Sequence, residues 1–174
     1  MKGPPLMLCL FHGRGGACRA MRERGWEVVC VDLDPAGNPT HVADVRSWTW
    51  TGRPPTLVWG SPPCQPYARH SMPWTRAKNP PEPDRSCWEA VGRIARETEA
   101  TYYVIENVKG AARFHGPPTA RIGPIYLWGE LPPNFPEFKV KPFKEKLSGR
   151  DAASRSITPY PVSLALALYV EAAQ

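Results

Sequence analysis

Short apolar runs separated by polar, glycine- or proline-containing turns occupy most of the chain. Runs rich in β-branched and aromatic residues with turn residues on both sides are typical of buried strands. The predicted strands are Leu6–Phe11, Glu27–Asp32, His41–Ala43, Thr56–Trp59 and Tyr102–Glu106. We expect two later runs, Ile125–Trp128 and Phe135–Val140, to pair as closing strands.

Segments with helical patterning lie between and after these strands. We expect helices at Ala17–Arg24, Cys87–Glu99 and Pro159–Ala172, with Ser86 as an N-cap and Pro161 in a first turn. Strands that alternate with helices predict an α/β fold with a doubly wound, mostly parallel sheet. The 174 residues suit one domain with its own core.

Two strand ends carry candidate chemistry. Cys64 follows the strand Thr56–Trp59 and lies between prolines, whose rings restrict the backbone and aim the thiol. Glu106 and Asn107 stand where the strand Tyr102–Glu106 ends. Open α/β sheets bind ligands at the carboxyl ends of their strands. The pattern therefore predicts a nucleophile and a proton donor on neighbouring strand ends, although a buried structural thiol is the alternative for Cys64.

A glycine-rich turn, residues 11–16, follows the first strand and is a candidate ligand loop. Glycines there allow positive φ and a close approach of the backbone to a ligand. Asp32 ends the second strand, where a carboxylate accepts bonds from the ribose hydroxyls of an adenosine. The spacing is not the dinucleotide fingerprint Gly-x-Gly-x-x-Gly. For Asp32 and Asp44, the alternative is a cap or turn role.

Charge favours a polyanionic partner. The net charge is +6 and the pI is about 9.2, although an ordinary basic soluble protein has the same values. One basic group follows Cys64 and is interleaved with aromatic rings: Arg69, Arg76, Lys78 and Arg85. A second comprises Lys139, Lys141, Lys144, Lys146 and Arg150. Both groups suit a phosphate backbone.

The five cysteines form no Cys-x-x-Cys pair and the four histidines show no ligand spacing, so we expect no metal site. Reduced, buried cysteines fit a cytoplasmic protein. No apolar run approaches the ~20 residues that span a bilayer. The first residues lack a signal-peptide pattern.

The two strand-end motifs together resemble the DNA cytosine-5 methyltransferase family. They stand here as Pro63-Cys64-Gln65 and Glu106-Asn107-Val108, downstream of the glycine-rich loop. The resemblance covers roughly residues 6–110 and returns weakly near 155–170. It implies a Rossmann-like sheet of the class I S-adenosylmethionine-dependent methyltransferase type, with S-adenosylmethionine as cofactor and DNA as partner.

The resemblance also implies roles for single residues. Cys64 would add to C6 of cytosine, Glu106 would protonate N3, and Asn107 would fix the loop that holds Cys64. We expect nearby positive charge to lower the pKa of Cys64, and burial to raise the pKa of Glu106. Arg121 is the best substitute for a catalytic arginine whose usual motif is not clearly present.

The remaining site predictions form two sets. Expected cofactor-binding residues are Phe11, Gly13, Arg14, Gly15, Gly16, Asp32, Leu33, Asp44, Val45 and Pro62. Expected DNA-binding residues are Gln65, Tyr67, Arg69, Trp74 and Arg76, several of which would fill the space left by a flipped base.

The chain departs from the family pattern at several points. Cys9 stands where the family has an acid, and His12 and Arg14 stand where it has small or apolar residues. Only about thirty residues separate Trp128 from Thr158, too few for a target-recognition domain. The chain thus resembles a minimal, single-domain, monomeric enzyme over residues 1–174, of a kind plausible in phage genomes, with a short or relaxed target.

Three alternatives stay open. Arg14 would pair with a carboxylate if the donor were a carboxylated S-adenosylmethionine, which makes the reaction carboxymethyl transfer. The same covalent chemistry would also serve C5 methylation of RNA or of a free nucleotide. An inactive DNA-binding subunit is the non-enzymatic alternative.

Overall fold

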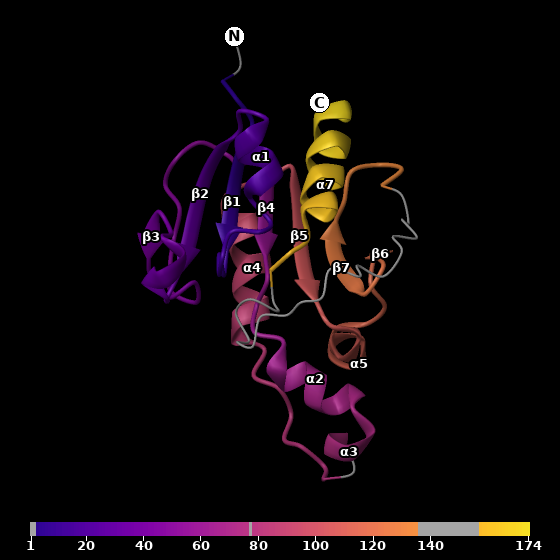
Figure 1. The fold of residues 1–174 in the computed structure, drawn as a ribbon. Coiled ribbons are helices and arrows are strands. Elements are labelled where there is room, and N and C mark those ends of the chain that lie inside the picture. The colour runs from indigo at the N-terminus through magenta and orange to yellow at the C-terminus, as the bar shows by residue number, and fades with distance from the viewer. Residues whose placement is uncertain (1–2, 77, 136–156) are drawn as a thin grey trace.

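A seven-stranded sheet forms the centre of the protein (Figure 1). The structure is a computed structural model that describes residues 3–76, 78–135 and 157–174. The strands are β1 (Leu6–Leu10), β2 (Glu27–Asp32), β3 (His41–Val42), β4 (Leu57–Gly60), β5 (Tyr102–Asn107), β6 (Ala120–Ile122) and β7 (Ile125–Glu130). Their order is β3-β2-β1-β4-β5-β7-β6, and the neighbours are parallel except for the antiparallel pairs β5–β7 and β7–β6. This arrangement confirms the predicted Rossmann-like, class I methyltransferase type of fold.

Helices cover both faces of the sheet and extend beyond one end of it (Figure 1). The helical elements are α1 (Arg19–Glu23), η1 (Pro35–Gly37), α2 (Gln65–Ser71), α3 (Pro73–Arg76), α4 (Ser86–Glu97), η2 (Lys109–Ala111), α5 (Ala112–His115) and α7 (Tyr160–Ala172). Helices α1 and α7 pack on one face, and α4 packs on the other. Helices α2 and α3 form a lobe beyond the carboxyl ends of the parallel strands, with α5 beside it.

The central strand β1 is fully buried because it has strands on both sides and helices on both faces. Its odd-numbered residues, such as Met7 and Cys9, face the core under α1 and α7. Its even-numbered residues, such as Leu8, face the core under α4. The continuous apolar run that predicted this strand is therefore the pattern that a doubly covered parallel strand requires.

The C-terminal helix α7 is fastened to the start of α1 by a buried serine. The Ser163 hydroxyl donates to the Ala17 carbonyl over 2.7 Å and accepts from the Ala20 amide over 3.1 Å. At the far end of α7, Glu171 accepts hydrogen bonds from Arg24 and from the Trp26 indole. These contacts hold the last helix against the beginning of the sheet.

Several predicted boundaries need correction. Strand β7 pairs with β5 and with β6. The strand that was predicted as its partner, Phe135–Val140, lies outside the described residues except for Phe135. Ser86 is the first residue of α4 and not its N-cap, which is Arg85. The Asp84 side chain accepts from the Ser86 amide over 2.8 Å just before the helix. Helix α7 carries proline in its first turn, as expected. Within the described ranges, no helix is long and apolar enough to cross a membrane.

Candidate active site

Cys64 ends the loop that leads from β4 to α2, at the edge of the sheet where the parallel strands finish. Its φ and ψ, −89° and −16°, make it the residue that begins α2. Pro62 is buried and Cys64 is partly buried, so the loop is anchored on one side while the thiol stays near the surface. Proline in the first turn is compatible with the helix, because the first amides need no intrahelical partner. The prolines around Cys64 therefore start α2, although the sequence interpretation treated them as loop residues.

Asn107 fixes this loop from the neighbouring strand, as the sequence analysis expected. Its Nδ2 donates to the Pro62 carbonyl over 3.0 Å, and its Oδ1 accepts from the Val108 amide over 2.9 Å. Asn107 is buried, with 1% of its surface exposed; its bond to Pro62 is buried and its bond to Val108 is partly buried. The Cys64 loop and the end of β5 are consequently held at a set separation.

Glu106 precedes Asn107 and lies partly buried beside the Cys64 loop. The Trp59 indole donates to the Ser61 hydroxyl over 2.8 Å, and Ser61 in turn hydrogen-bonds the Glu106 carboxyl. Burial raises the pKa of Glu106 from 4.5 to about 7, and the Ser61 bond opposes this increase. Near neutral pH, this carboxyl can therefore hold or release a proton.

The thiol of Cys64 is less acidic than the sequence analysis expected. Burial raises its pKa above 9.0, and the negative charge of Glu106 raises it further. The expectation that positive charge lowers this pKa is wrong for the protein alone, because the charge that acts on the thiol is the Glu106 anion. Above pH about 7, and below the thiol pKa, Cys64 and Glu106 together hold one proton.

Tyr67 does not face the space in front of Cys64. Its side chain is buried, its hydroxyl lies 3.0 Å from His115 Nε2, and its ring meets those of Trp88 and Phe114. The helical turn of α2 directs this side chain into the core, so we do not include Tyr67 among the residues proposed to contact DNA. Tyr67 instead anchors the α2–α3 lobe to α4 and α5.

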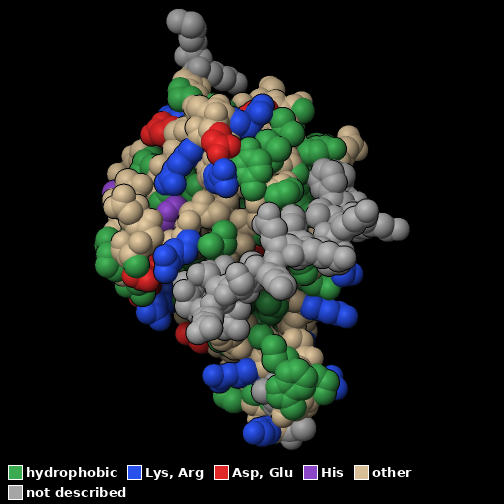
Figure 2. Space-filling view, in the orientation of Figure 1, with side chains coloured by type: hydrophobic (Ala, Val, Ile, Leu, Met, Phe, Trp, Pro, Cys, Tyr) green, Lys and Arg blue, Asp and Glu red, His purple; other side chains and the backbone are tan. Residues whose placement is uncertain are grey.

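Exposed basic and apolar side chains cover the rest of that lobe. Arg69, Arg76 and Lys78 are exposed, and 68% of Trp74 is exposed at its tip. Figure 2 shows this apolar patch with Lys and Arg side chains around it. Gln65, next to Cys64, is also exposed. The second basic group, at 139–150, lies outside the described residues.

The glycine-rich loop is tied to the end of β2. The Gly13 amide donates to Asp32 Oδ2 over 2.8 Å, and the Asp34 amide donates to Oδ1 over 2.9 Å. Gly13, Gly15 and the non-glycine Phe11 have φ of 54°, 76° and 58°. A carboxylate has about four acceptor positions. Asp32 therefore retains the capacity to accept bonds from ribose hydroxyls.

The segment before α7 closes on the same loop. A Cβ on Gly16 would collide with the backbone of Thr158 and with the Ile157 side chain, so only glycine fits at this position. Arg14 is exposed in the loop, where it leaves the carboxylated-donor alternative open. Val45 is buried and 63% of Leu33 is exposed, so the two differ in their access to a ligand.

Two other predicted site residues are occupied by local contacts. Arg46 binds Asp44 with both guanidinium and amide nitrogens and lowers the pKa of that carboxyl. Such an exposed pair is weak because solvent screens it, so it does not prevent Asp44 from binding a ligand. Arg121 lies in β6, and in the register of the sheet it is two strands away from Asn107. Its side chain donates to the Gly123 carbonyl and packs over the Tyr126 ring. The structure does not bring Arg121 to the Cys64 site.

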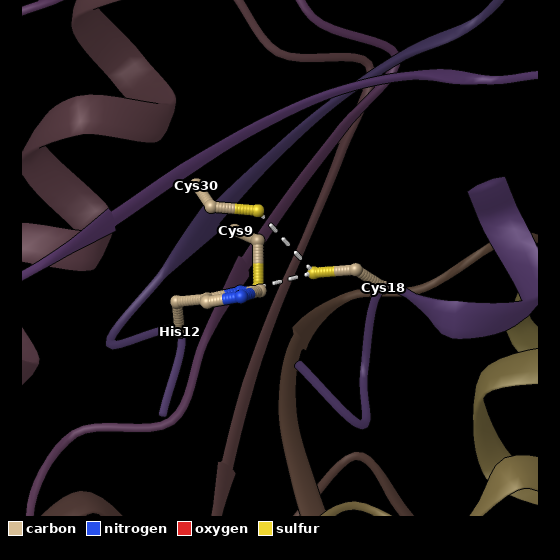
Figure 3. A group of neighbouring side chains, drawn as sticks. All are labelled: Cys9, His12, Cys18 and Cys30. Carbon is tan, nitrogen blue, oxygen red and sulfur yellow. Dashed lines mark hydrogen bonds between the residues drawn. The ribbon is translucent and has the colours of Figure 1, made fainter. Parts of the chain in front are cut away.

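Beneath the glycine-rich loop, the structure brings together four side chains that the sequence analysis did not connect. They are Cys9, His12, Cys18 and Cys30, all buried (Figure 3). The expectation that no histidine or cysteine has ligand spacing rested on separations along the chain. Strand pairing and the loop bring these residues together instead.

The chain is similar to known methyltransferases. No protein-family model matches it. It is 34% identical over 56 residues to the type II methyltransferase M.SacI of Streptomyces achromogenes, a match that covers 32% of this chain and 14% of that protein. This chain thus matches only about one seventh of its curated relative's length.

Three solved structures match part of the chain at low identity. A protein described as a DNA modification methyltransferase of an E. coli prophage is 19% identical, with a TM-score of 0.48 over 64% of this chain and 34% of its own. Entamoeba histolytica EhMeth is 20% identical, with a TM-score of 0.46 over 64% of this chain and 40% of its own. Spodoptera frugiperda DNMT2 is 22% identical, with a TM-score of 0.41 over 63% of this chain and 37% of its own. Over a limited segment, the chain is therefore similar in sequence to a type II methyltransferase.

Proposed function

We propose that this chain is a DNA cytosine-5 methyltransferase that uses S-adenosylmethionine and forms a covalent adduct through Cys64. The observation that supports it best is the arrangement of Cys64, Glu106 and Asn107 on two adjacent strand ends. A thiol, a carboxyl with a pKa of about 7 and an amide that ties their loops together suit nucleophilic addition with protonation of the base. The resemblance supports this assignment, and the M.SacI similarity supports a methyltransferase.

The cofactor would lie over the glycine-rich loop, with the ribose at Asp32 and the adenine near Asp44 and Val45. The positive-φ glycines and the unused acceptor positions of Asp32 fit such a ligand. When bound, S-adenosylmethionine supplies an electrophilic methyl group. Gly16 and the Thr158 segment would limit the space at that side of the site.

The chain's residues would act in three steps. The Cys64 thiolate forms a bond to C6 of the flipped cytosine, while Glu106 donates its proton to N3 and neutralises the developing negative charge. C5 would become electron-rich and take the methyl group as the bond between that group and the cofactor sulfur breaks, which leaves S-adenosylhomocysteine. A base would then remove the proton on C5, and the freed electron pair would form the C5–C6 double bond as the S–C6 bond breaks and its pair returns to sulfur as thiolate. N3 would give its proton back to Glu106, which restores the starting state of the pair.

The thiol and the carboxyl share a single proton in the active state. The productive form has a Cys64 thiolate and a protonated Glu106, which together hold as many protons as a thiol with a carboxylate. Because Glu106 loses its negative charge on protonation, it no longer raises the thiol pKa. Moving one proton within the pair therefore both activates the nucleophile and supplies the acid.

The DNA would lie across the α2–α3 lobe. Exposed arginines and lysines suit phosphate contacts, and exposed Trp74 suits stacking on a base. Phosphate contacts carry no sequence information, so the described lobe favours a short or relaxed target.

Nucleoside mass spectrometry tests this function. DNA from cells that express the chain is digested, and modified cytosines are compared with DNA from cells that express Cys64→Ala at equal protein level. We expect 5-methylcytosine only with the parent chain. A carboxymethyl product would support the Arg14 alternative, whereas unmodified DNA, with modified RNA in the same cells, would contradict the DNA assignment.

A further inference from the structure

Four buried ligand-type side chains meet under the glycine-rich loop (Figure 3). Cys9 lies on β1, and Cys30 lies directly opposite it on β2, so both thiols face the same side of the sheet. His12 belongs to the loop after β1, and Cys18 is the residue just before α1. None of the four is more than 6% exposed.

Two separations between their ligand atoms match those around a tetrahedral metal ion. Cys18 Sγ lies 3.7 Å from Cys30 Sγ and 3.5 Å from His12 Nδ1, and all four ligand atoms lie within 4.8 Å of one another. With Zn–S about 2.3 Å and Zn–N about 2.0 Å, a tetrahedral site has S–S edges of about 3.8 Å and S–N edges of about 3.5 Å. We propose that Cys9, His12, Cys18 and Cys30 bind one Zn²⁺ ion.

A neighbouring cation supports this assignment. Arg22 Nη2 lies 3.0 Å from Cys30 Sγ, part-buried and on the first helix. Three thiolates and a neutral imidazole around Zn²⁺ carry a net charge of −1, which one guanidinium offsets. A guanidinium directed at a neutral thiol in the core would gain little. Groups around the ligands orient them and tune the metal, and Arg22 would be such a partner for Cys30.

The site is of the closed, structural kind. Four protein ligands leave no open position for water or substrate, and burial on all sides keeps solvent out. The proposed nucleophile Cys64 is not part of it. The zinc ion in this site would stabilise the fold and would take no part in methyl transfer.

The metal would set the shape of the cofactor loop. The His12 amide donates to the Val31 carbonyl over 3.2 Å, and the His12 carbonyl accepts from the Gly15 amide over 3.0 Å. The next residue, Gly13, bonds Asp32. One ion would therefore join β1, the loop, α1 and β2 at the position where the loop turns. Cys9 and His12 are also two of the residues at which the chain departs from the pattern of the family it resembles.

Metal analysis of the purified full chain, without a histidine tag, tests the proposal. We expect one zinc per chain by elemental analysis and by native mass spectrometry. Replacement with Co²⁺ should give the intense visible bands of a tetrahedral thiolate site. A chelator should lower the melting temperature of the parent chain.

Variants separate the proposed site from adventitious binding. Cys18→Ser is expected to lower zinc affinity at least tenfold, whereas Cys87→Ser, the matched change outside the group, should leave it unaltered. His12→Ala keeps the three thiols and should also lower affinity at least tenfold, which serves as the second test if Cys18→Ser does not fold.

Three results would overturn the proposal. The first is a folded parent chain that has five reduced thiols and takes up no zinc during dialysis. The second is a mass lower by two hydrogens, which means a disulfide within the group. The third is stoichiometric iron in place of zinc.

Discussion

Replacing Glu106 by glutamine should change how the stability of the protein depends on pH. Burial raises the pKa of this carboxyl from 4.5 to about 7, so the folded protein binds its proton more tightly than the unfolded chain does. The protonated form therefore contributes stability that is present in full below pH about 4.5 and is lost as pH rises through about 7. Glutamine has nearly the same shape and stays uncharged throughout.

The size of the effect follows from the shift. A rise of about 2.5 pKa units corresponds to about 3 kcal/mol, at about 1.36 kcal/mol per unit. Between about pH 5 and about pH 8, the titration of this one group should remove about 2.5 kcal/mol from the free energy of unfolding. The loss is large compared with the usual stability of a domain, about 5–15 kcal/mol.

Urea unfolding at about pH 5 and at about pH 8 measures this loss in the free energy of unfolding. The free energy of unfolding should fall by about 2.5 kcal/mol more in the parent than in Glu106→Gln, since every other titrating group is common to both. Glu89→Gln, at an exposed position of α4, is the matched control and should follow the parent. Parallel curves for the parent and Glu106→Gln would refute a strongly raised pKa at this site.

Three further predictions concern transfer and local packing. The rate of transfer should follow a bell-shaped pH profile that rises through pH about 7 and falls above the raised pKa of Cys64, because the active pair holds one proton. Steady-state rates across pH test this profile, and a rate that falls as pH rises through 7 would contradict it. Asn107→Ala should lose about 1–3 kcal/mol of stability and reduce turnover, because the buried Pro62 carbonyl and the partly buried Val108 amide lose their partner. A variant with the parent's urea midpoint and rate would exclude the role. Gly16→Ala should weaken cofactor binding and stability by about 1–3 kcal/mol because its Cβ meets the backbone before α7, whereas Gly92→Ala in α4 should not; calorimetry and melting measure both.

The central strands were predictable because their sequence pattern and their environment agree. Leu6–Leu10 is a continuous apolar run, and a strand with neighbours on both sides and helices on both faces needs such a run. The strand ends at Cys64 and Glu106 followed from the same pattern, since parallel strands bring their carboxyl ends to one edge. The structure adds the Trp59–Ser61–Glu106 hydrogen bonds, which no spacing along the chain indicates.

Other features depend on contacts between distant segments. Strand β6 has three residues and lies between prolines and a glycine, so its local signal is weak and pairing with β7 decides its state. Tyr67 is adjacent to a proline-rich loop, but the helix that begins at Cys64 turns it into the core. Cys9 and Cys30 stand far apart in sequence and become neighbours only through the register of β1 and β2.

Covalent trapping with DNA that contains 5-fluorocytosine tests the proposed chemistry most directly. Fluorine at C5 cannot leave as a proton, so an enzyme that adds Cys64 to C6 should remain bound to the DNA after the methyl group is transferred. We expect a denaturation-resistant complex that requires S-adenosylmethionine, with the modified peptide mapped to Cys64 and with no complex for Cys64→Ala. A chain that methylates cytosine without forming this complex, or a complex that persists in Cys64→Ala, would contradict the account.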